Sequence, residues 1–442
     1  MKAFIFAALC FLLFWLPIPL GSYRPWAIFL FSFAISTLFL FHLFLVFKNK
    51  KPLFPPSYST WLLVPLIAVI SILIVQLIPS IGKLNAFGLI SSISIDPMQT
   101  KITLMKTITM FLLSWLIFSY CNNSKNLKIM CYAIVAGGLF QAIYATYLNL
   151  NPDTISPIFN YRFTQRAIGS FTYSNFLANY LAMCLSIGIG VLISQLSLTG
   201  SGKNIREKTK GLLTVILSSK MLLRASLILM IIALILTRSR MGNSAFFMSF
   251  AAVSIFAFFF YNRKPKNLRL LIISFFIMDL IIVGALFGVD KVRDRLVETS
   301  LKSETRDEVV RDSVPIIKAH LLLGTGGGTF YSAFPQYQPE PYSGYYDNAH
   351  NDYIQFAVEF GVPTTLLLGA LVLGALLTSL RTMVKRKTPL YQGVSFGAAV
   401  AILHMLLHST VDYSLQAGAN SFTFIVILCF VFISAKLPRE KS

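Results

Sequence analysis

The chain has 442 residues, of which 56% are hydrophobic and 12% charged, and its formal net charge is +21. A soluble chain carries roughly 25% charged residues, so this composition excludes an ordinary soluble domain. Its apolar residues come in runs of about 20, the length that crosses a bilayer as a helix, whereas barrel strands would alternate over shorter segments. We therefore predict an all-α, polytopic membrane protein that forms a single integral membrane domain over residues 1–442.

Twelve apolar runs are predicted to span the membrane. The first could be a signal peptide because Lys2 precedes it, but it lacks a small-x-small cleavage site and continues into "LPIPLG", which favours a retained helix. In chain order the predicted spans are 3–20, 26–47, 61–80, 102–120, 129–149, 175–196, 221–237, 243–261, 269–288, 354–380, 393–411 and 420–435.

The distribution of Lys and Arg predicts the orientation of these spans. With the N-terminus inside, the loops assigned to the cytoplasm are strongly basic, and their only acids are Glu207 and Glu440. Positive residues favour the cytoplasmic side of short loops. The high positive charge is therefore explained by topology. We predict no nucleic-acid partner, because no basic soluble domain is present to bind one.

One predicted outer loop, residues 289–353, is far longer than the others. Loops of this length are usually either functional or disordered. Its first half is charged and typical of a helix, and "GTGGGTF" follows, with glycine at 324, 326, 327 and 328. No Lys-Ser or Lys-Thr follows these glycines, so the segment is not a Walker loop. A tight turn and a close backbone approach to a ligand both remain possible readings.

Two arginine pairs are candidate anion-binding residues. Arg238 and Arg240 in "LTRSRMGN" lie at the predicted outer end of a span. Arginines at helix ends often only extend their charged groups to the membrane–water interface. These two arginines, however, lie on the predicted outer side, where positive residues are otherwise disfavoured. Their position therefore favours a function. Arginine suits bidentate contact with phosphate. For Arg306 and Arg311 in "SETRDEVVRDS", the charge pattern alone favours a solvated helix with ion pairs at i, i+4 spacing.

Two histidine-containing segments are the other candidates. His350 lies in "YYDNAHNDYIQFAVEFG" beside polar residues that can orient its ring, so a general base or proton shuttle is a fair hypothesis. In "LHMLLHSTVDYSLQ", His404, His408 and Asp412 repeat every four residues on one predicted helix face. Residues eight apart on a helix are about 12 Å apart along its axis, too far for three ligands on one metal. We predict a polar stripe lining a cavity, with at most His408 and a neighbour sharing an ion.

Several of these segments, in chain order, resemble motifs of the O-antigen ligase and polymerase superfamily. Its members are bacterial inner-membrane glycosyltransferases. The chain departs from the family pattern in two places: an aromatic residue usual after the loop arginine is Val310, and an Asn-Pro-Asn-like turn reads Tyr173-Ser174-Asn175. The segments are "RAIGSFTYSNFLANYL" (166–181), "LTRSRMG" (236–242), "TRDEVVRDSVPIIKAHLLLGTGGGTF" (305–330), "AHNDYIQFAVEFGVP" (349–363) and "HSTVDYSLQ" (408–416).

The resemblance implies a reaction and a set of residues. The chain is expected to move a glycan from undecaprenyl diphosphate to an acceptor hydroxyl, that of lipid A core, on the periplasmic side of the bacterial inner membrane. His350 is the implied base, and Arg240 and Arg306 the implied diphosphate-binding residues. No nucleotide, metal or other cofactor is expected. The implied substrate-binding residues are Arg238, Arg311, Arg166, Asn348, Asn351, Asp352, Tyr353, His408 and Asp412.

Other functions stay open at this point. A glycan polymerase or a protein O-oligosaccharyltransferase of the same superfamily would use the same catalytic set with another acceptor. A transporter is the alternative outside the enzymes. Transporters usually place charges near the middle of the membrane and contain repeats or paired broken helices, whereas the polar residues of this chain gather at the predicted outer boundary. This pattern favours an enzyme.

Overall fold

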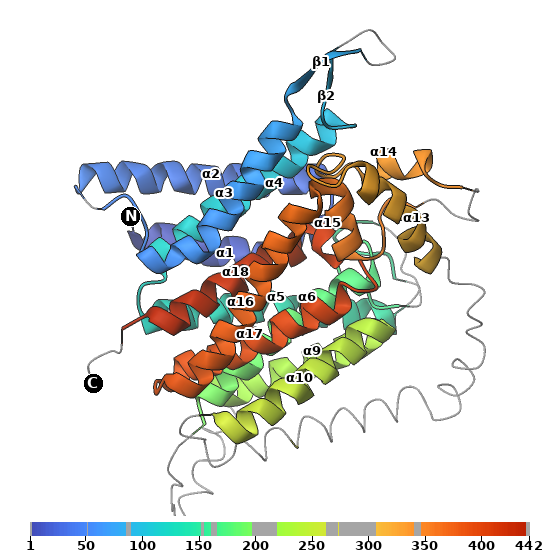
Figure 1. The fold of residues 1–442 in the computed structure, drawn as a ribbon. Coiled ribbons are helices and arrows are strands. Elements are labelled where there is room, and N and C mark those ends of the chain that lie inside the picture. The colour runs from blue at the N-terminus through green and yellow to red at the C-terminus, as the bar shows by residue number, and fades with distance from the viewer. Residues whose placement is uncertain are drawn as a thin grey trace, which may run out of the picture.

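A computed structural model of the chain describes residues 2–50, 52–84, 90–151, 154–160, 166–196, 219–261, 273, 306–339 and 346–438. Within these ranges the protein is a bundle of long apolar helices (Figure 1), which confirms the all-α, multi-pass class. Nine described helices are long and apolar enough to cross a membrane. They are α2 (Pro25–Lys48), α3 (Thr60–Gln76), α4 (Pro97–Tyr120), α5 (Ser124–Leu150), α6 (Ser174–Ser194), α10 (Arg240–Phe260), α16 (Val362–Lys385), α17 (Pro389–His408) and α18 (Gly418–Lys436).

Two further predicted spans appear as shorter apolar helices, α1 (Lys2–Trp15) and α9 (Ser219–Leu236). The predicted span 269–288 lies outside the described residues except for residue 273. Polar residues at the helix starts explain several boundaries, since Asp, Asn and Ser side chains satisfy the first free backbone N–H groups of a helix. Asp96 accepts from Met98 N at 3.1 Å and so begins α4, and Asn123 accepts from Asn126 N at 2.8 Å and begins α5.

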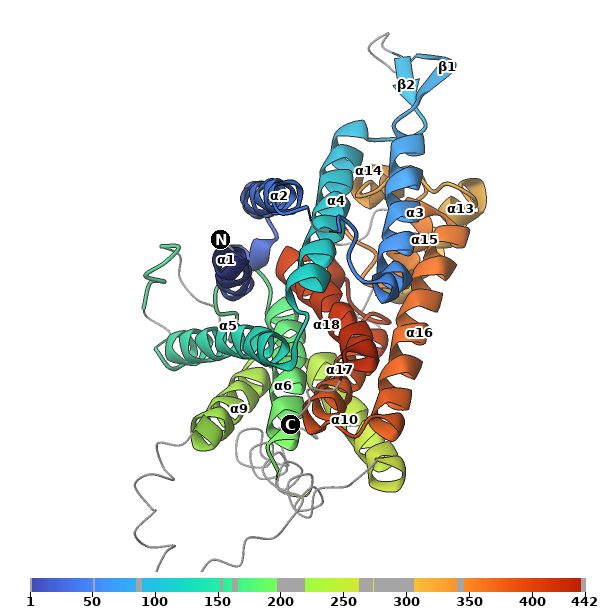
Figure 2. The ribbon, with the colours of Figure 1, turned by 90° about the vertical axis from the view of Figure 1, so that its left-hand side faces the viewer.

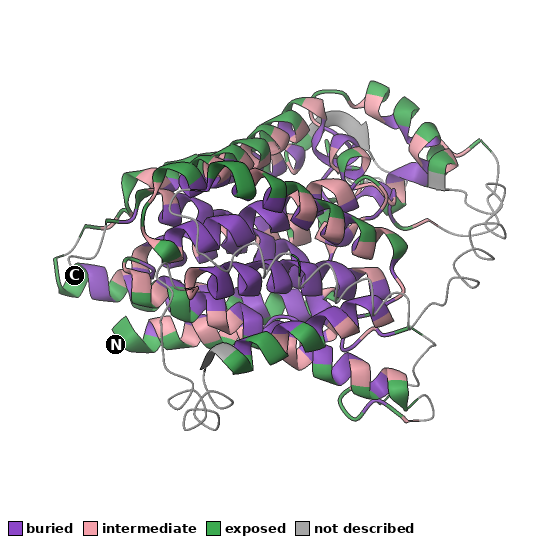
Figure 3. Cartoon of the chain, turned by 90° about the horizontal axis from the view of Figure 1, so that it is seen from below, coloured by how far each residue is buried: buried purple, intermediate pink, exposed green. Residues whose placement is uncertain are grey.

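The centre of the bundle consists of α6, α17 and α18. The apolar stretch of α6 is 100% buried and that of α18 94% buried, whereas that of α16 is only 17% buried and faces outward. Figure 3 shows this concentration of buried residues in the middle of the molecule. Glycines let α6 and α17 touch at their backbones, because a Cβ on Gly190 would lie 2.2 Å from the Gly393 carbonyl oxygen. Small residues permit such close approach between membrane helices.

The structure corrects the predicted span 354–380. The chain forms two helices there, α15 (Asp352–Phe360) and α16. Gly361 separates them with a φ of +80°, and a Cβ at this position would lie 2.4 Å from the Leu322 carbonyl oxygen. Because other residues rarely adopt this backbone conformation, Gly361 ends α15 and lets the chain turn into the outer helix α16.

A short hairpin was also not predicted. Strands β1 (Pro79–Leu84) and β2 (Ile90–Ser92) pair antiparallel between α3 and α4, with Pro79 opposite Ser92 and Leu84 opposite Ile90. It extends beyond the helices at one end of the bundle (Figures 1 and 2). The predicted span 61–80 therefore ends at Gln76, where the hairpin begins to form.

The described part of the long loop has a small core of its own. It contains α13 (Arg306–Ala319), α14 (Phe330–Ala333) and a 3-10 turn at Phe334–Gln336. Residues from α13, α14 and α15 form a hydrophobic cluster separate from the bundle core, made of Val309, Ile316, Phe330, Ala333, Phe334, Ala349 and Val358. Residues 289–305 and 340–345 lie outside the described ranges.

The glycine run 324–328 serves packing in this structure. A Cβ on Gly324 would lie 2.4 Å from the Glu359 backbone, and one on Gly328 would lie 2.8 Å from Thr103 Oγ1. Thr325 N donates to Val358 O at 2.8 Å, and Gly328 N donates to the Glu359 carboxylate at 2.9 Å. The run therefore holds the loop against α15 and α4, and its glycines are explained without a ligand.

The two ends of the bundle differ in charge. We call the end where α9 and α17 finish and α6, α10 and α15 begin the His350 end, and the opposite end the basic end. Lys48, Lys125, Lys385 and Lys436 lie at or near helix termini of the basic end, where α1 begins and α18 ends (Figure 1). Acidic and basic residues mix at the His350 end, so the described residues show the charge separation expected of a protein oriented in a membrane.

Candidate active site at the His350 end

His350 lies immediately before α15 in a left-handed backbone conformation, with a φ of +50°. Its half-buried ring lies between two tyrosines. The centroid of the Tyr413 ring is 4.6 Å away and that of Tyr346 5.7 Å away, both edge to face. These contacts fix the plane of the imidazole, a requirement for a directed proton transfer.

The residues after His350 attach α15 to the end of α17. Asn351 accepts from Tyr353 N and Ile354 N, which starts α15, and its Nδ2 donates to Thr410 O at 2.9 Å. Tyr353 Oη donates to Leu406 O at 2.8 Å. Three of the predicted substrate-binding residues, Asn351, Asp352 and Tyr353, thus have described partners in the protein itself. Their contact with substrate stays a prediction.

Asp352 is buried and holds the turn that follows α17. Its Oδ2 accepts from Ser409 Oγ at 2.9 Å, and its backbone N donates to Ser409 O at 3.0 Å. Burial raises the pKa of Asp352 to about 8. Asn348, also buried, accepts from Gln355 Nε2 at 3.0 Å and hydrogen-bonds the Tyr23 hydroxyl. Both side chains thereby fix the backbone on either side of His350.

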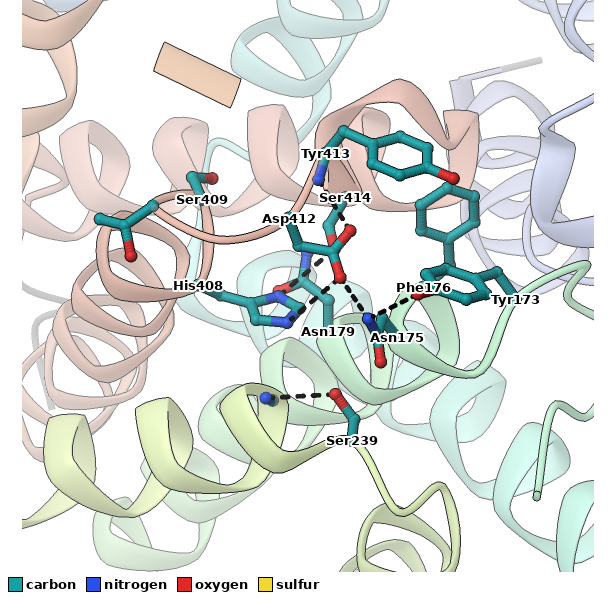
Figure 4. A network of polar contacts seen from close by, with 12 residues as sticks. Tyr173, Asn175, Phe176, Asn179, Ser239, His408, Ser409, Asp412, Tyr413 and Ser414 are labelled. Carbon is teal, nitrogen blue, oxygen red and sulfur yellow. Dashed lines mark hydrogen bonds and ion pairs between the residues drawn. The ribbon is translucent and has the colours of Figure 1, made fainter. Parts of the chain in front are cut away.

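Asp412 is the centre of a second polar cluster (Figure 4). Asn175 Nδ2 donates to Asp412 Oδ2, and His408 Nε2 lies 4.0 Å from the same oxygen. His408 Nδ1 is 3.3 Å from Ser414 Oγ. The predicted single helix face is wrong in one respect: α17 ends at His408, and Asp412 comes from the following turn. The turn nevertheless brings Asp412 back beside His408.

A histidine stack continues this cluster into the bundle. His404 and His408 have ring centroids 5.5 Å apart, and His404 Nε2 lies 2.7 Å from Asn179 Oδ1. Asn175 and Asn179 were not singled out from the sequence as site residues. Two asparagines four apart in an apolar helix lie on one face, and this was the available signal. Among the described residues, no three His, Cys, Asp or Glu side chains converge as a metal-binding group.

The arginine-containing turn also lies beside α6. Arg238 has a φ of +51°, and Arg240 is the exposed first residue of α10. Ser239 Oγ accepts from Gly242 N at 3.2 Å, and a Cβ on Gly242 would lie 2.9 Å from Ala178 Cβ of α6. Ala178 lies one turn from Asn175, which contacts Asp412, so neighbouring positions of α6 contact the start of α10 and the turn after α17.

Arg166 joins the same end of the bundle. The next residue, Ala167, donates its backbone N–H to Leu236 O at 3.1 Å, at the end of α9. Arg166 is exposed, and Arg238 lies two residues beyond Leu236. Hydrogen bonding of the backbone thus brings Arg166, Arg238 and Arg240 to one region, although they come from segments far apart in the sequence.

The structure describes the side chain of only one of the two loop arginines, Arg311. Arg306 is the first residue of α13, and its side chain lies outside the described residues. Arg311 has a 69% exposed side chain, and its Nε lies 3.0 Å from Asp312 Oδ1. This ion pair joins sequence neighbours, where the charge pattern predicted i, i+4 pairs. The roles of Arg306 and Arg311 toward a substrate stay predictions.

Aromatic side chains form a wall beside His350. Tyr413 is stacked on Tyr173 at 6.3 Å and contacts Phe176 edge to face at 5.2 Å, and Tyr23 lies 5.3 Å from Phe176. Of this group, only Tyr173 belongs to a feature predicted from the sequence, the turn that departs from the family pattern. The wall comes from three separate segments, near residues 23, 173–176 and 413, so no single stretch of sequence reveals it.

Buried charges support the site from below. Lys106 of α4 donates to Leu415 O and Gln416 O, each at 3.1 Å, and so holds the segment that follows Tyr413. Glu359 accepts from Gln355 Nε2 at 2.8 Å as well as from Gly328 N. Burial raises the pKa of Glu359 to about 7. Both residues act through the protein backbone, which gives the site a rigid base.

Part of the chain that contains this site is similar to a known protein family. Residues 225–369 match the family model of O-antigen ligase, and no curated protein gives a significant match to the chain. The matched segment contains Arg238, Arg240, Arg306, Arg311 and His350 through Tyr353, whereas Arg166, Asn175, His408 and Asp412 lie outside it. Over this segment, which is less than half of the chain, the protein is similar to O-antigen ligase.

Proposed function

We propose that the protein transfers a glycan from undecaprenyl diphosphate to a hydroxyl of lipid A core at the periplasmic face of the inner membrane. The family match supports a glycosyltransferase of the ligase and polymerase type. The observation that carries the proposal is the arrangement at the His350 end. A histidine held between tyrosines and a turn with two arginines lie at the same end of a membrane bundle.

The proposed reaction needs a base and a site for negative charge. The acceptor oxygen forms a bond to the anomeric carbon of the donor sugar, and the bond from that carbon to the diphosphate oxygen breaks. His350 takes the acceptor proton, and undecaprenyl diphosphate leaves with the bonding electron pair. Arg240, together with Arg238 and Arg306, would bind the diphosphate and stabilise the charge that develops on it. In this proposal the reaction needs neither a nucleotide nor a metal.

Two features support these assignments. His350 and Arg238 both have positive φ values without being glycine. Such backbone conformations cost free energy and are enriched at functional sites. In the aromatic wall, Tyr23, Tyr173 and Tyr413 are only partly buried and lie around the buried Phe176. These tyrosines offer flat apolar surfaces on which the carbon-bound faces of sugar rings can pack.

A deletion strain tests the acceptor. If the proposal is right, the strain makes lipopolysaccharide without polymer and accumulates polymer on the lipid carrier, and the intact gene restores the polymer. Lipopolysaccharide capped with a single repeat would identify a polymerase instead, and loss of glycan from proteins alone would identify a protein glycosyltransferase. Unchanged glycans with altered solute uptake would contradict glycan transfer altogether and favour the transporter.

A further inference from the structure

A groove lies at the basic end of the molecule, far from His350. It has a volume of about 600 Å³ and runs between α3, α16 and α18, within the range of roughly 300–1,000 Å³ typical of ligand sites. Its apolar part includes Trp61, Leu371, Leu377 and Phe432. Its α16 lining runs from Leu367 to Lys385, about 27 Å at the helical rise. The groove therefore extends from the end of the bundle into the depth of the hydrocarbon.

The groove is open toward the lipid. Helix α16 is the least buried of the described candidate spans, and Trp61 and Leu377 are 67% and 52% exposed. Gly374 lines the groove, and a Cβ built on it meets no atom within 4 Å. A small residue at this place leaves a hollow on the helix surface that a flexible chain can fill.

Cations surround the mouth of the groove. Arg381, Lys385, Arg386 and Lys436 all line it, and none of its lining residues is acidic. Arg386 has a structural task, because it donates to Leu437 O and lies over the Tyr391 ring at 4.7 Å. Arg381, Lys385 and Lys436 form no ion pair within the described part of the chain. Three positive charges thus lie above an apolar hollow.

We propose that this groove binds an anionic glycerophospholipid of the phosphatidylglycerol type, from the leaflet at the basic end. Its phosphate would lie among Arg381, Lys385 and Lys436, and one acyl chain would lie along Gly374 and Leu371. Basic pockets between membrane helices bind such head groups. The bias of positive charge toward one side of a membrane explains cations at every loop of this end, but not their position over a hollow.

Other basic residues at the same end show this contrast. Lys48 lies over the Phe44 ring at 5.8 Å and Lys128 over the Tyr132 ring at 6.0 Å, and neither lines the groove. The predicted span 269–288, of which only residue 273 is described, is a poor occupant on charge. It begins with Arg269 and is preceded by Arg263, Lys264 and Lys266, and these cations would repel the basic mouth. An anionic lipid head group, in contrast, complements the positive charge at the mouth of the groove.

Native mass spectrometry of the purified full chain tests the proposal. Protein equilibrated with equal amounts of palmitoyl-oleoyl phosphatidylglycerol and phosphatidylethanolamine should retain the anionic lipid preferentially. Replacing Arg381, Lys385 and Lys436 by Gln together should weaken this retention by roughly fivefold per cation, the effect of one basic residue at an anionic surface. Equal retention of the two lipids by the wild-type chain would overturn the proposal without any variant.

A second variant separates the hollow from the charge. Gly374→Leu keeps every cation and fills the groove with a side chain for which there is space, so it should also reduce retention of phosphatidylglycerol at least fivefold. Lys125→Gln with Lys128→Gln removes charge from the same end outside the groove and should leave retention unchanged. Retention that survives Gly374→Leu, or that falls as far in the control pair as in the groove variants, means general surface attraction and rejects the site.

The occupant can be identified directly. A diazirine amino acid placed at Thr378, which lines the groove, should form a covalent adduct with phosphatidylglycerol on illumination. A cross-link to a peptide from residues 269–288, a covalent dimer or an adduct with a polyisoprenoid lipid would each show that something else fills the groove, and would overturn the proposal.

Discussion

At the scale of single residues, the two arginines of the "TRSRMG" turn differ in exposure. Arg238 is partly buried with a strained backbone, whereas Arg240 is exposed at the first position of α10. The free N–H groups of a helix N-terminus also attract anions. Arg240 therefore combines a permanent positive charge with a helix start at the same point, and this combination suits a diphosphate.

We predict that Arg240→Lys loses most glycan transfer although the charge is kept, since an ammonium group cannot form the planar two-point contact of a guanidinium. Transfer from the lipid-linked donor by purified protein measures this effect. Arg224→Lys, at an exposed position near the start of α9 at the opposite end of the bundle, is the matched control and should transfer at the wild-type rate. Equal rates for Arg240→Lys and Arg224→Lys would remove Arg240 from the diphosphate site.

For the proposed base we predict a loss of about 10²–10⁴-fold in rate on His350→Ala, the usual contribution of a general base. His42→Ala is the control, because His42 is a buried histidine at the basic end whose Nδ1 lies 3.2 Å from Tyr120 Oη. Both proteins must reach the membrane at normal levels. Near-normal transfer by well-expressed His350→Ala would leave the histidine as a structural residue before α15.

At the scale of elements, α15 is attached at both of its ends. Asp352 binds the turn after α17, and Glu359 binds the glycine run. Asp352 retains a proton in the fold because burial raises its pKa to about 8, while an unfolded aspartate loses it near pH 4. The unfolded chain thus binds fewer protons between these pH values, and stability falls as the pH rises from about 4 to about 8.

Asp352→Asn should remove this part of the pH dependence, since the amide stays neutral at every pH. The apparent melting temperature in detergent, measured from pH 5 to pH 9, should fall with pH in the wild-type protein and fall less steeply in the variant. Ser409→Ala is a useful comparison, because it removes the hydrogen bond to Asp352 but keeps the titrating carboxyl. Identical slopes in the wild-type and Asp352→Asn proteins would show that Asp352 does not hold a proton in the fold.

The break between α15 and α16 leads to a separate prediction. Gly361→Ala adds a Cβ that would lie 2.4 Å from the Leu322 carbonyl oxygen, at a φ of +80°, so it should destabilise the protein by about 1–3 kcal/mol. Gly369→Ala, on the exposed face of α16 with no atom within 4 Å, is the control. Comparison of melting temperatures tests this. A Gly361→Ala protein as stable as Gly369→Ala would contradict the proposed need for glycine.

Much of this level of structure could be predicted from the sequence, and the reasons are physical. Each long apolar run reports a span directly, so the helices from α2 to α6, α17 and α18 were predicted with errors only at their ends. "EFGVP" contained the signal for the break at Gly361, but the apolar residues on both sides read as one span. The hairpin after Gln76 was not predicted, and the predicted span 61–80 covers the first two residues of its first strand.

The candidate site was only partly predictable. His350 and its neighbours formed a polar group within one segment, so the sequence revealed them together. The contacts of Asn175 with Asp412 and of Asn179 with His404 depend on the packing of α6 against α17, and periodicity within one helix contains no information on its partner. The charge bias already favoured a function for Arg240, whereas the charge pattern around Arg306 favoured a solvated helix, and only the family resemblance indicated Arg306.

At the scale of the whole molecule, the charges of the two ends predict the orientation. With the basic end in the cytoplasm, the long loop and His350 face the periplasm. Alkaline phosphatase fused near residue 320 should be active, and the same enzyme fused after residue 442 should be inactive. A green fluorescent protein series at the same two positions gives the reciprocal control. The opposite pattern would invert the molecule and place the proposed site in the cytoplasm.

The composition of the site has a consequence for how such proteins can be recombined. His350 and the arginines lie within residues 225–369, whereas Asn175 and Asp412, which contact each other beside them, lie before and after that segment. A chimera that exchanges only the matched segment between two relatives would therefore import a histidine and arginines from one parent into surroundings built by the other. The two parents must therefore also match in α6 and in the turn after α17. The segment that sequence comparison identifies is thus smaller than the part of the chain that has to be exchanged together to keep the site intact.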